Sequence, residues 1–146
     1  YLILFSSELE LIKNINCKMN KLIIDAAKDK VFLMIINNDI NYNMSLENSK
    51  NNYEKLALVI NEFLTRNNLK ISEVNQIYIN QGPGSFAGIR NSLSVVKAFH
   101  LVNKIDYYCF SFSDFVEEND IKYENIPELC KKFKVKKNLI NPIYLS

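Results

Sequence analysis

All three glycines of this 146-residue chain lie within one short segment, and this concentration is the strongest constraint on its fold. The segment begins at Asn80 and reads NQGPGSFAGIRNSL. Glycine adopts positive φ angles and lets another backbone approach closely, and Pro83 fixes φ between Gly82 and Gly84. An apolar run at residues 77–79 precedes the segment, and a helical pattern follows it. The sequence therefore predicts a strand, a tight turn and the start of a helix.

The residues of this turn are compatible with two roles. Ser85 is placed to cap the helix, and the N–H groups of a first helical turn attract anions. The segment has neither the Gly-x-x-x-x-Gly-Lys-Ser/Thr pattern nor the Gly-x-Gly-x-x-Gly pattern of known phosphate-binding loops. A structural turn is the leading interpretation, and an anion site is the alternative. The residues assigned to this structural loop are Gly82, Pro83, Gly84, Ser85, Gly88 and Arg90.

Apolar runs and amphipathic patterns around the turn predict an α/β fold. Patterns at residues 51–66 and 86–102 place apolar side chains at helical spacing, and a weaker pattern predicts a short helix at 127–133. The order β-β-β-α-β-α-β predicts a mixed five-stranded sheet with flanking helices, because the last strands are joined by helical crossovers. The runs expected to form strands are residues 22–24, 31–36, 40–45, 77–79 and 107–110.

Composition limits the classes of protein to which the chain can belong. Its length predicts one domain, and no apolar run approaches the ~20 residues of a membrane span. A net charge of +2 does not by itself indicate a nucleic-acid-binding protein. Three scattered cysteines indicate free thiols in a reducing, cytoplasmic environment. The single histidine, His100, lies among apolar residues and is expected to be a packed or surface side chain.

The exact order of residues in the glycine segment is a more specific signal of family than its possible anion-binding chemistry. Residues 82–90, GPGSFAGIR, closely resemble the Gly-Pro-Gly-Ser-Phe-Thr-Gly-Leu/Val-Arg signature of the TsaB (YeaZ-like) family. Residues 19–27 resemble the opening strand of that family, residues 53–64 coincide with its first helix, and residues 141–145 resemble its Pro-Val-Tyr-Leu-Arg ending. The resemblance implies an actin-like half-domain of the sugar kinase, Hsp70 and actin superfamily.

The resemblance also implies a domain organisation. Residues 1–18 are interpreted as an N-terminal appendage or as upstream sequence, with Met19 as the natural start. Residues 19–113 are expected to form the TsaB-like, actin-like domain. Residues 114–146 are expected to be a short remnant of the C-terminal region, because little sequence separates residue 113 from Pro142 and the second domain of the family is largely missing.

TsaB proteins belong to the bacterial apparatus that makes threonylcarbamoyladenosine beside the anticodon of tRNA. The resemblance implies a non-catalytic scaffold, an inactive homologue, that binds and activates a TsaD-like catalytic subunit. A TsaE-like ATPase is expected to join through the complex. The alternative is a small actin-like nucleotide-binding protein.

Several departures from enzyme patterns lead to the expectation of no catalytic residue, no metal and no cofactor. Asp25 ends the first predicted strand, but two alanines follow it in place of the Gly and Thr/Ser of actin-like nucleotide enzymes. Asn51 stands near the position of a histidine found in many family members. Ser85 lacks a partner base, because His100 would lie about four turns along the same helix.

Two surfaces are expected to meet partners. The predicted helices carry more apolar positions than one sheet face needs, so they are expected to bind the TsaD-like subunit or to form a homodimer, with Leu93 as an exposed member. Residues 131–137 hold five lysines. A solvated basic face is the leading interpretation there, and a contact with tRNA phosphates is the alternative. The residues assigned to the partner interface are Phe86, Ile89, Leu93, Val96, Phe99, Tyr53 and Leu56.

Overall fold

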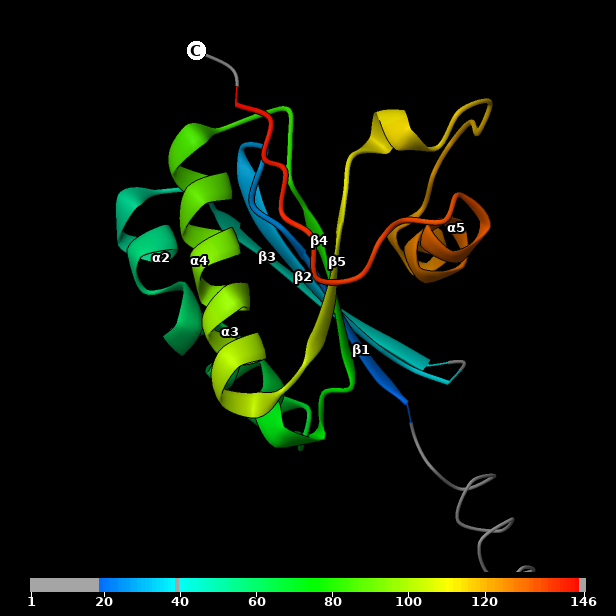
Figure 1. Cartoon of the computed structure of the whole chain (residues 1–146). Helices are drawn as coiled ribbons and strands as arrows, with labels where there is room; N and C mark the ends of the chain where they lie inside the picture. The colour runs from blue at the N-terminus through cyan, green and yellow to red at the C-terminus, as the bar shows by residue number, and fades with distance from the viewer. Residues whose placement is uncertain (1–18, 39, 145–146) are drawn as a thin grey trace, which may run out of the picture.

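A mixed five-stranded sheet forms the centre of the protein (Figure 1). The structure is a computed structural model and describes residues 19–38 and 40–144. The first three strands form an antiparallel meander, and the last two run parallel to the first, which gives the order β3-β2-β1-β4-β5. This arrangement confirms the predicted mixed sheet. The strands are β1 (Asn20–Asp25), β2 (Lys30–Asn37), β3 (Ile40–Glu47), β4 (Gln76–Asn80) and β5 (Asp106–Phe110).

Helices cover both faces of the sheet (Figure 1). One face carries α2, α3 and α4, and the other carries α5. No helix in the described part of the chain has the length and apolarity needed to cross a membrane. The expectations for residues 1–18 fall outside the described residues. The helices are α2 (Lys50–Glu54), α3 (Leu56–Arg66), α4 (Phe86–Asn103) and α5 (Ile126–Lys132), with 3-10 turns η1 (Ile71–Glu73), η2 (Phe112–Asp114) and η3 (Tyr123–Asn125).

The helix predicted over residues 51–66 is divided into two in the structure. The break lies at Lys55, whose φ of −107° and ψ of 24° depart from the helical region. The preceding turn is rich in asparagine, and the Asn52 side chain donates a hydrogen bond to the Glu47 carbonyl at 2.8 Å. Asparagine side chains that bond to nearby backbone compete with helix formation. The apolar spacing of the segment was therefore a good guide to its buried face but not to its continuity.

Two apolar clusters stabilise the layers on either side of the sheet. The larger cluster lies under α3 and α4 and includes Leu22 and Ile77 of the sheet with Ile60 of α3. The smaller one lies under α5 and includes Phe110 of β5 and Ile126 of α5. Every strand of the parallel part is thus buried on both faces, as expected for parallel strands. The described part of the C-terminal region, after residue 113, contributes to the second of these layers.

The last described residues return along the sheet to the glycine turn. Asn138 is held against β5, because its backbone N–H donates to the Tyr107 carbonyl at 2.8 Å and its side chain accepts from the Tyr107 N–H at 2.9 Å. Further on, the Ile143 N–H donates to the Gln81 carbonyl at 2.8 Å, and Tyr144 forms a parallel bridge with Gly84. The tail motif and the glycine segment, which lie far apart in the sequence, therefore meet in space.

Candidate functional site

The candidate site lies where the parallel strands β1 and β4 end side by side. Ligands of open α/β sheets bind outside the carboxyl ends of such strands. Asp25 ends β1 and Asn80 ends β4, and both side chains are buried. The Asn80 amide donates to Asp25 Oδ1 at 3.1 Å, and the Ala27 N–H donates to the same oxygen at 3.1 Å. The Asn80 side-chain oxygen accepts from the Gly82 N–H at 2.9 Å, which connects the acid to the start of the glycine turn.

Tyr123 covers the other oxygen of this acid. Its hydroxyl donates to Asp25 Oδ2 at 2.6 Å, and its ring stacks on Phe32 with centroids 4.0 Å apart. Burial, together with the hydrogen bond to Asp25, raises the pKa of the Tyr123 phenol well above its usual value. Both carboxylate oxygens of Asp25 are thus engaged by groups of this chain. Within residues 19–38 and 40–144 there is also no cluster of three or more His, Cys, Asp or Glu side chains able to hold a metal ion.

The glycine turn packs directly against backbone. Gly82 has a φ of +112°, the left-handed region that favours glycine, and a Cβ there would overlap the Ile143 carbonyl oxygen. A Cβ on Gly84 would overlap the carbonyl oxygen of Ala27. Gly88 similarly abuts the carbonyl oxygen of residue 26. All three glycines therefore allow another segment of backbone to approach closely. Gly82 alone also adopts a positive φ.

The remaining residues assigned to the structural loop lie around the start of α4. Ser85 is the N-cap of α4, because its hydroxyl accepts from the Gly88 N–H at 3.3 Å. Pro83 is exposed. Arg90 is also exposed, makes no ion pair with a described residue, and places its guanidinium carbon 5.9 Å from the Phe86 ring centroid. The structure thus brings the assigned loop residues together at one end of the sheet.

A hollow of about 470 Å³ lies beside the turn. Its lining includes Lys28, Gly84, Ser85 and Asn48. The Asn48 amide donates to the carbonyls of residues 26 and 28, but its buried side-chain oxygen has no partner among the described residues. The Ser85 N–H, which an anion would need, already donates to the Ala27 carbonyl at 2.8 Å. This hollow is where the alternative anion site would lie.

The residues assigned to the partner interface separate into two groups. Leu56, Ile89, Leu93 and Val96 are buried between the helices and the sheet. The expectation that Leu93 is exposed was wrong: only 5% of it is accessible, because this stripe of α4 forms the core of the domain. Phe86 is 51% exposed, and Phe99 and Tyr53 are partly exposed.

Other apolar residues on the same helices are more exposed than those the sequence singled out. Leu58 on α3 is 56% exposed, and Leu101 and Val102 on α4 are 62% and 77% exposed. The helical spacing shows that Leu101 does not continue the stripe formed by Ile89, Leu93 and Val96, but it does not show which side of α4 is inward. The predicted apolar stripe of α4 is therefore the core face of the helix and not a surplus of exposed positions.

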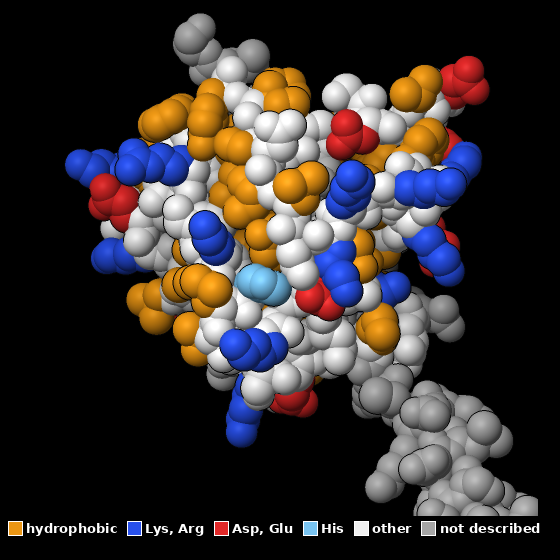
Figure 2. Space-filling view, viewed as in Figure 1, with side chains coloured by type: hydrophobic (Ala, Val, Ile, Leu, Met, Phe, Trp, Pro, Cys, Tyr) orange, Lys and Arg blue, Asp and Glu red, His pale blue; other side chains and the backbone are white. Residues whose placement is uncertain are grey.

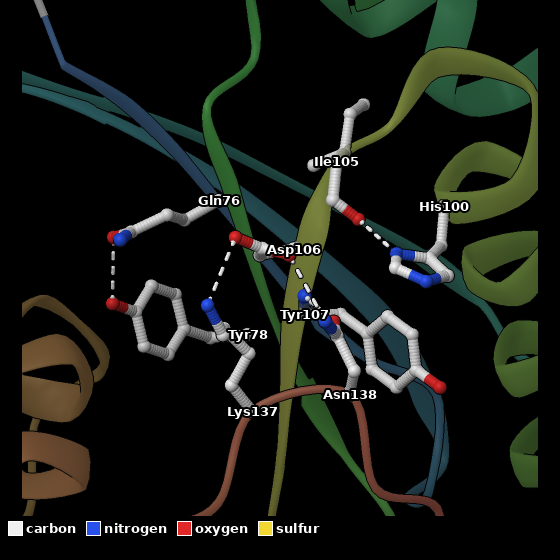
Figure 3. Close-up of polar contacts among 8 residues, drawn as sticks. All are labelled: Gln76, Tyr78, His100, Ile105, Asp106, Tyr107, Lys137 and Asn138. Atoms are coloured by element: carbon white, nitrogen blue, oxygen red, sulfur yellow. Dashed lines mark hydrogen bonds and ion pairs between the residues drawn. The ribbon is translucent and has the colours of Figure 1, made fainter.

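The histidine and the two described cysteines pack against other parts of the domain, and Figure 3 shows His100 beside Ile105 and Tyr107. His100 Nδ1 lies 2.9 Å from the Ile105 carbonyl oxygen, and the ring meets Tyr107 edge-on. Cys109 and Cys130 are buried, and burial raises the pKa of each thiol to about 12. Thiols with such values are unreactive near neutral pH.

The sheet order and the helical crossover on α4 define an actin-like α/β half-domain. The chain belongs to the family described as TsaD: tRNA N6-adenosine threonylcarbamoyltransferase, whose model matches residues 46–130, more than half of the chain. Within it, the chain is TsaB/YeaZ-like, as the resemblance of the glycine segment had implied.

One curated relative agrees with this assignment, and two solved structures share the fold. The chain is 30% identical over 77 residues to the tRNA threonylcarbamoyladenosine biosynthesis protein TsaB of Buchnera aphidicola, a match that covers 53% of this chain and 35% of the relative. YeaZ from Pseudomonas aeruginosa superposes with a TM-score of 0.59 at 17% identity, over 64% of this chain and 44% of that one. Thermus thermophilus RuvC superposes with a TM-score of 0.50 at 11% identity, over 84% and 83% of the two chains. The two structural matches show the fold alone, and the chain spans about a third of the curated relative.

Proposed function

We propose that this protein is a non-catalytic subunit of the apparatus that threonylcarbamoylates the adenosine beside the anticodon of tRNA. Its task in this proposal is to bind and activate a TsaD-like catalytic subunit, in the cytoplasm where tRNA is modified. Support comes from the family and from the relative named for threonylcarbamoyladenosine biosynthesis. A TsaE-like ATPase would then meet this protein through the shared complex.

The hydrogen bonding of Asp25 is the observation that carries the non-catalytic part of the proposal. In an actin-like enzyme an acid at this strand end would face the phosphates or their metal. Here one carboxylate oxygen accepts from the Asn80 amide and the Ala27 N–H, and the other accepts from the Tyr123 hydroxyl. An acid that is 1% exposed and accepts three hydrogen bonds within its own domain stabilises the fold, and its burial keeps it from a substrate.

The proposed partner surface is the outward side of α3 and α4. Its exposed apolar members are Leu58, Phe86, Leu101 and Val102. Figure 2 shows orange apolar side chains gathered over these helices with basic side chains between them. Exposed apolar groups collected on one face with a polar rim are typical of protein interfaces. In the absence of the catalytic subunit, the same surface would support a homodimer.

Co-purification with the TsaD-like subunit of the same organism tests this proposal. We expect wild type to bind and to stimulate threonylcarbamoyl transfer, whereas Leu101→Glu and Phe86→Glu remain folded and lose binding. Leu139→Glu is the matched control, because Leu139 is 54% exposed but lies outside the helices. Unchanged binding by both helix variants would contradict the proposed surface, and transfer by the isolated protein would contradict its non-catalytic role.

The alternative, a small actin-like nucleotide-binding protein, is favoured by one observation. The hollow beside the glycine turn has a lysine, Lys28, and the hydroxyl of the N-cap residue Ser85 in its lining. Thermal melting with and without millimolar ATP and Mg²⁺ separates the two functions. A scaffold melts at the same temperature in both conditions, whereas a nucleotide-binding protein is stabilised by its ligand.

A further inference from the structure

The face of the sheet under α5 alternates between polar and aromatic rows. Strand register places Lys21, Gln76 and Asp106 side by side in one cross-strand row. The next row on the same face contains Tyr78 and Tyr108, whose rings stack with centroids 5.0 Å apart. Figure 3 shows Gln76 and Tyr78 on the side of β5 that faces α5, opposite to His100 and Tyr107. The Tyr78 hydroxyl donates to the Gln76 side chain at 2.9 Å.

A groove of about 470 Å³ lies between this face and α5. Tyr78 and Tyr108 contribute to its lining from the sheet, together with Lys21. Lys131 and Lys134 contribute from α5 and the turn after it. The volume lies within the range of about 300–1,000 Å³ that is usual for ligand sites. An aromatic lining is therefore combined with three lysines from two different parts of the chain.

The lysines of the groove are not neutralised by neighbouring acids. Within the described residues, Lys132 pairs with Glu118 at 2.7 Å and Lys137 pairs with Asp106 at 3.7 Å. The three lysines of the groove, Lys21, Lys131 and Lys134, form no ion pair with a described residue. Glu128 is the one acidic residue of the lining. Figure 2 shows basic side chains gathered over α5 and the segment after it. The groove thus carries a local positive charge that the overall charge of the chain does not reveal.

We propose that this groove binds RNA, with phosphates beside Lys21, Lys131 and Lys134 and an unpaired base against Tyr108, whose ring is backed by the buried Tyr78. Lysines that neutralise phosphates release counterions, which favours a polyanion. Aromatic side chains on a sheet face accept bases that are not already stacked in a duplex, so the partner is RNA with an unpaired loop. The inference rests on the proposed function for the identity of that RNA as tRNA. The groove lies on the opposite face of the sheet from α4, so RNA and a protein partner could be held together.

Fluorescence anisotropy with the full chain and a labelled RNA hairpin tests the groove, with a fully paired RNA duplex of equal length for comparison. We expect the hairpin to bind more tightly than the duplex. Lys131→Ala/Lys134→Ala should weaken binding about tenfold at low salt. The slope of log affinity against log salt concentration should also become shallower by about 1–2, because one to two phosphate contacts are lost. Tyr108→Ala should weaken hairpin binding at least about fivefold and leave duplex binding unchanged.

The matched control is Lys50→Ala/Lys97→Ala, which removes the same charge from the helices on the other face. Circular dichroism checks that each variant is folded. Equal losses in the control, a preference for the duplex, or no binding by wild type at low salt would overturn the proposal. Co-purification with the TsaD-like subunit is measured on the same variants. If the protein binds that subunit but not RNA, the groove proposal alone is rejected. If it binds RNA but not the subunit, the proposed function alone is rejected.

Discussion

At the scale of single residues, the acid at the end of β1 shows how a site can be converted into structure. Asp25 and Tyr123 are 98 residues apart in the sequence, yet their side chains meet at 2.6 Å. The sequence identified Asp25 as a strand-ending acid that lacks the following Gly and Thr/Ser of actin-like nucleotide enzymes. Tyr123 could not have been found from the sequence, because no local pattern indicates which distant hydroxyl will donate a hydrogen bond to a buried carboxylate.

Replacement of Tyr123 by phenylalanine tests this contact. Tyr123→Phe leaves one carboxylate oxygen of Asp25 without a donor, so we expect the free energy of unfolding to fall by about 1–3 kcal/mol. Tyr42→Phe is the matched control, because Tyr42 is exposed on β3. Urea unfolding at neutral pH measures both. Equal stability of the two variants would contradict the role assigned to the Tyr123 hydroxyl.

The same contact predicts the response to alkali. The pKa of Tyr123 is raised in the folded protein above its ordinary value of 10.0, so the folded state resists ionisation of a phenol that ionises freely in the unfolded chain. Stability from this group is therefore fully present below pH 10 and is lost as the pH rises beyond it. Thermal melting between pH 8 and pH 11 should show a smaller loss in Tyr123→Phe than in wild type. An identical pH dependence in both proteins would refute the assignment.

The two described cysteines make a further prediction at this scale. Burial raises the pKa of Cys109 and Cys130 to about 12, so the thiolate needed for reaction is scarce near neutral pH. In a Cys17→Ser background, a thiol reagent should label the native protein slowly and the urea-unfolded protein rapidly. Fast labelling of the native protein would show that one of the two sites opens readily.

At the scale of elements, each predicted strand and the helix after the glycine turn occur within one or two residues of their expected positions. Periodicity was reliable here because each element buries a single face. It could not show which of two apolar stripes on α4 is inward, since that depends on how the helix is rotated over the sheet. It also missed the break at Lys55, where the backbone leaves the helical region.

The orientation of α4 about its own axis predicts opposite outcomes for two similar substitutions. Leu93→Glu puts a carboxylate into the core, so we expect a loss of several kcal/mol or failure to fold. Leu101→Glu adds the same group at an exposed position of the same helix and should change stability by no more than about 0.5 kcal/mol. Circular dichroism and urea unfolding compare the two. A stable Leu93→Glu variant would mean that α4 is rotated differently.

The glycine turn predicts a cost that is independent of any ligand. Gly84→Ala drives a methyl group into the Ala27 carbonyl, so we expect a loss of about 1–3 kcal/mol. Ser94→Ala, an exposed change on the helix α4 that follows the turn, is the control. Both melting temperatures should be insensitive to ATP and Mg²⁺. If the ligands stabilise wild type and this effect disappears in Gly84→Ala, the turn is a phosphate site.

At the scale of the whole molecule, contacts between distant segments join the sheet, the turn and the C-terminal region into one body. The tail resembled a family ending, but its docking on the glycine turn was not predictable, because bridges between distant residues leave no periodic signal. The Ile143 carbonyl abuts Gly82, and the Ile143 N–H bonds to Gln81. The Phe86 ring at the start of α4 packs against Tyr144 with centroids 4.7 Å apart. The tail therefore supports the same turn that begins the proposed partner helix.

A chain that ends after residue 138 tests this support. It keeps Asn138 and its bonds to β5, but it loses the Ile143 bond to Gln81 and the Tyr144 contact with Phe86. We expect a loss of roughly 1–3 kcal/mol, the size usual for removal of a few partly exposed contacts. Hydrogen exchange should rise in the glycine turn and the first turn of α4, while β1 and β2 stay protected. Tyr144→Ala in the full chain is the matched control, because it removes only the aromatic contact and should reproduce part of the effect. Uniform exchange across the whole sheet, or no change at the turn, would show that the tail does not act on this site.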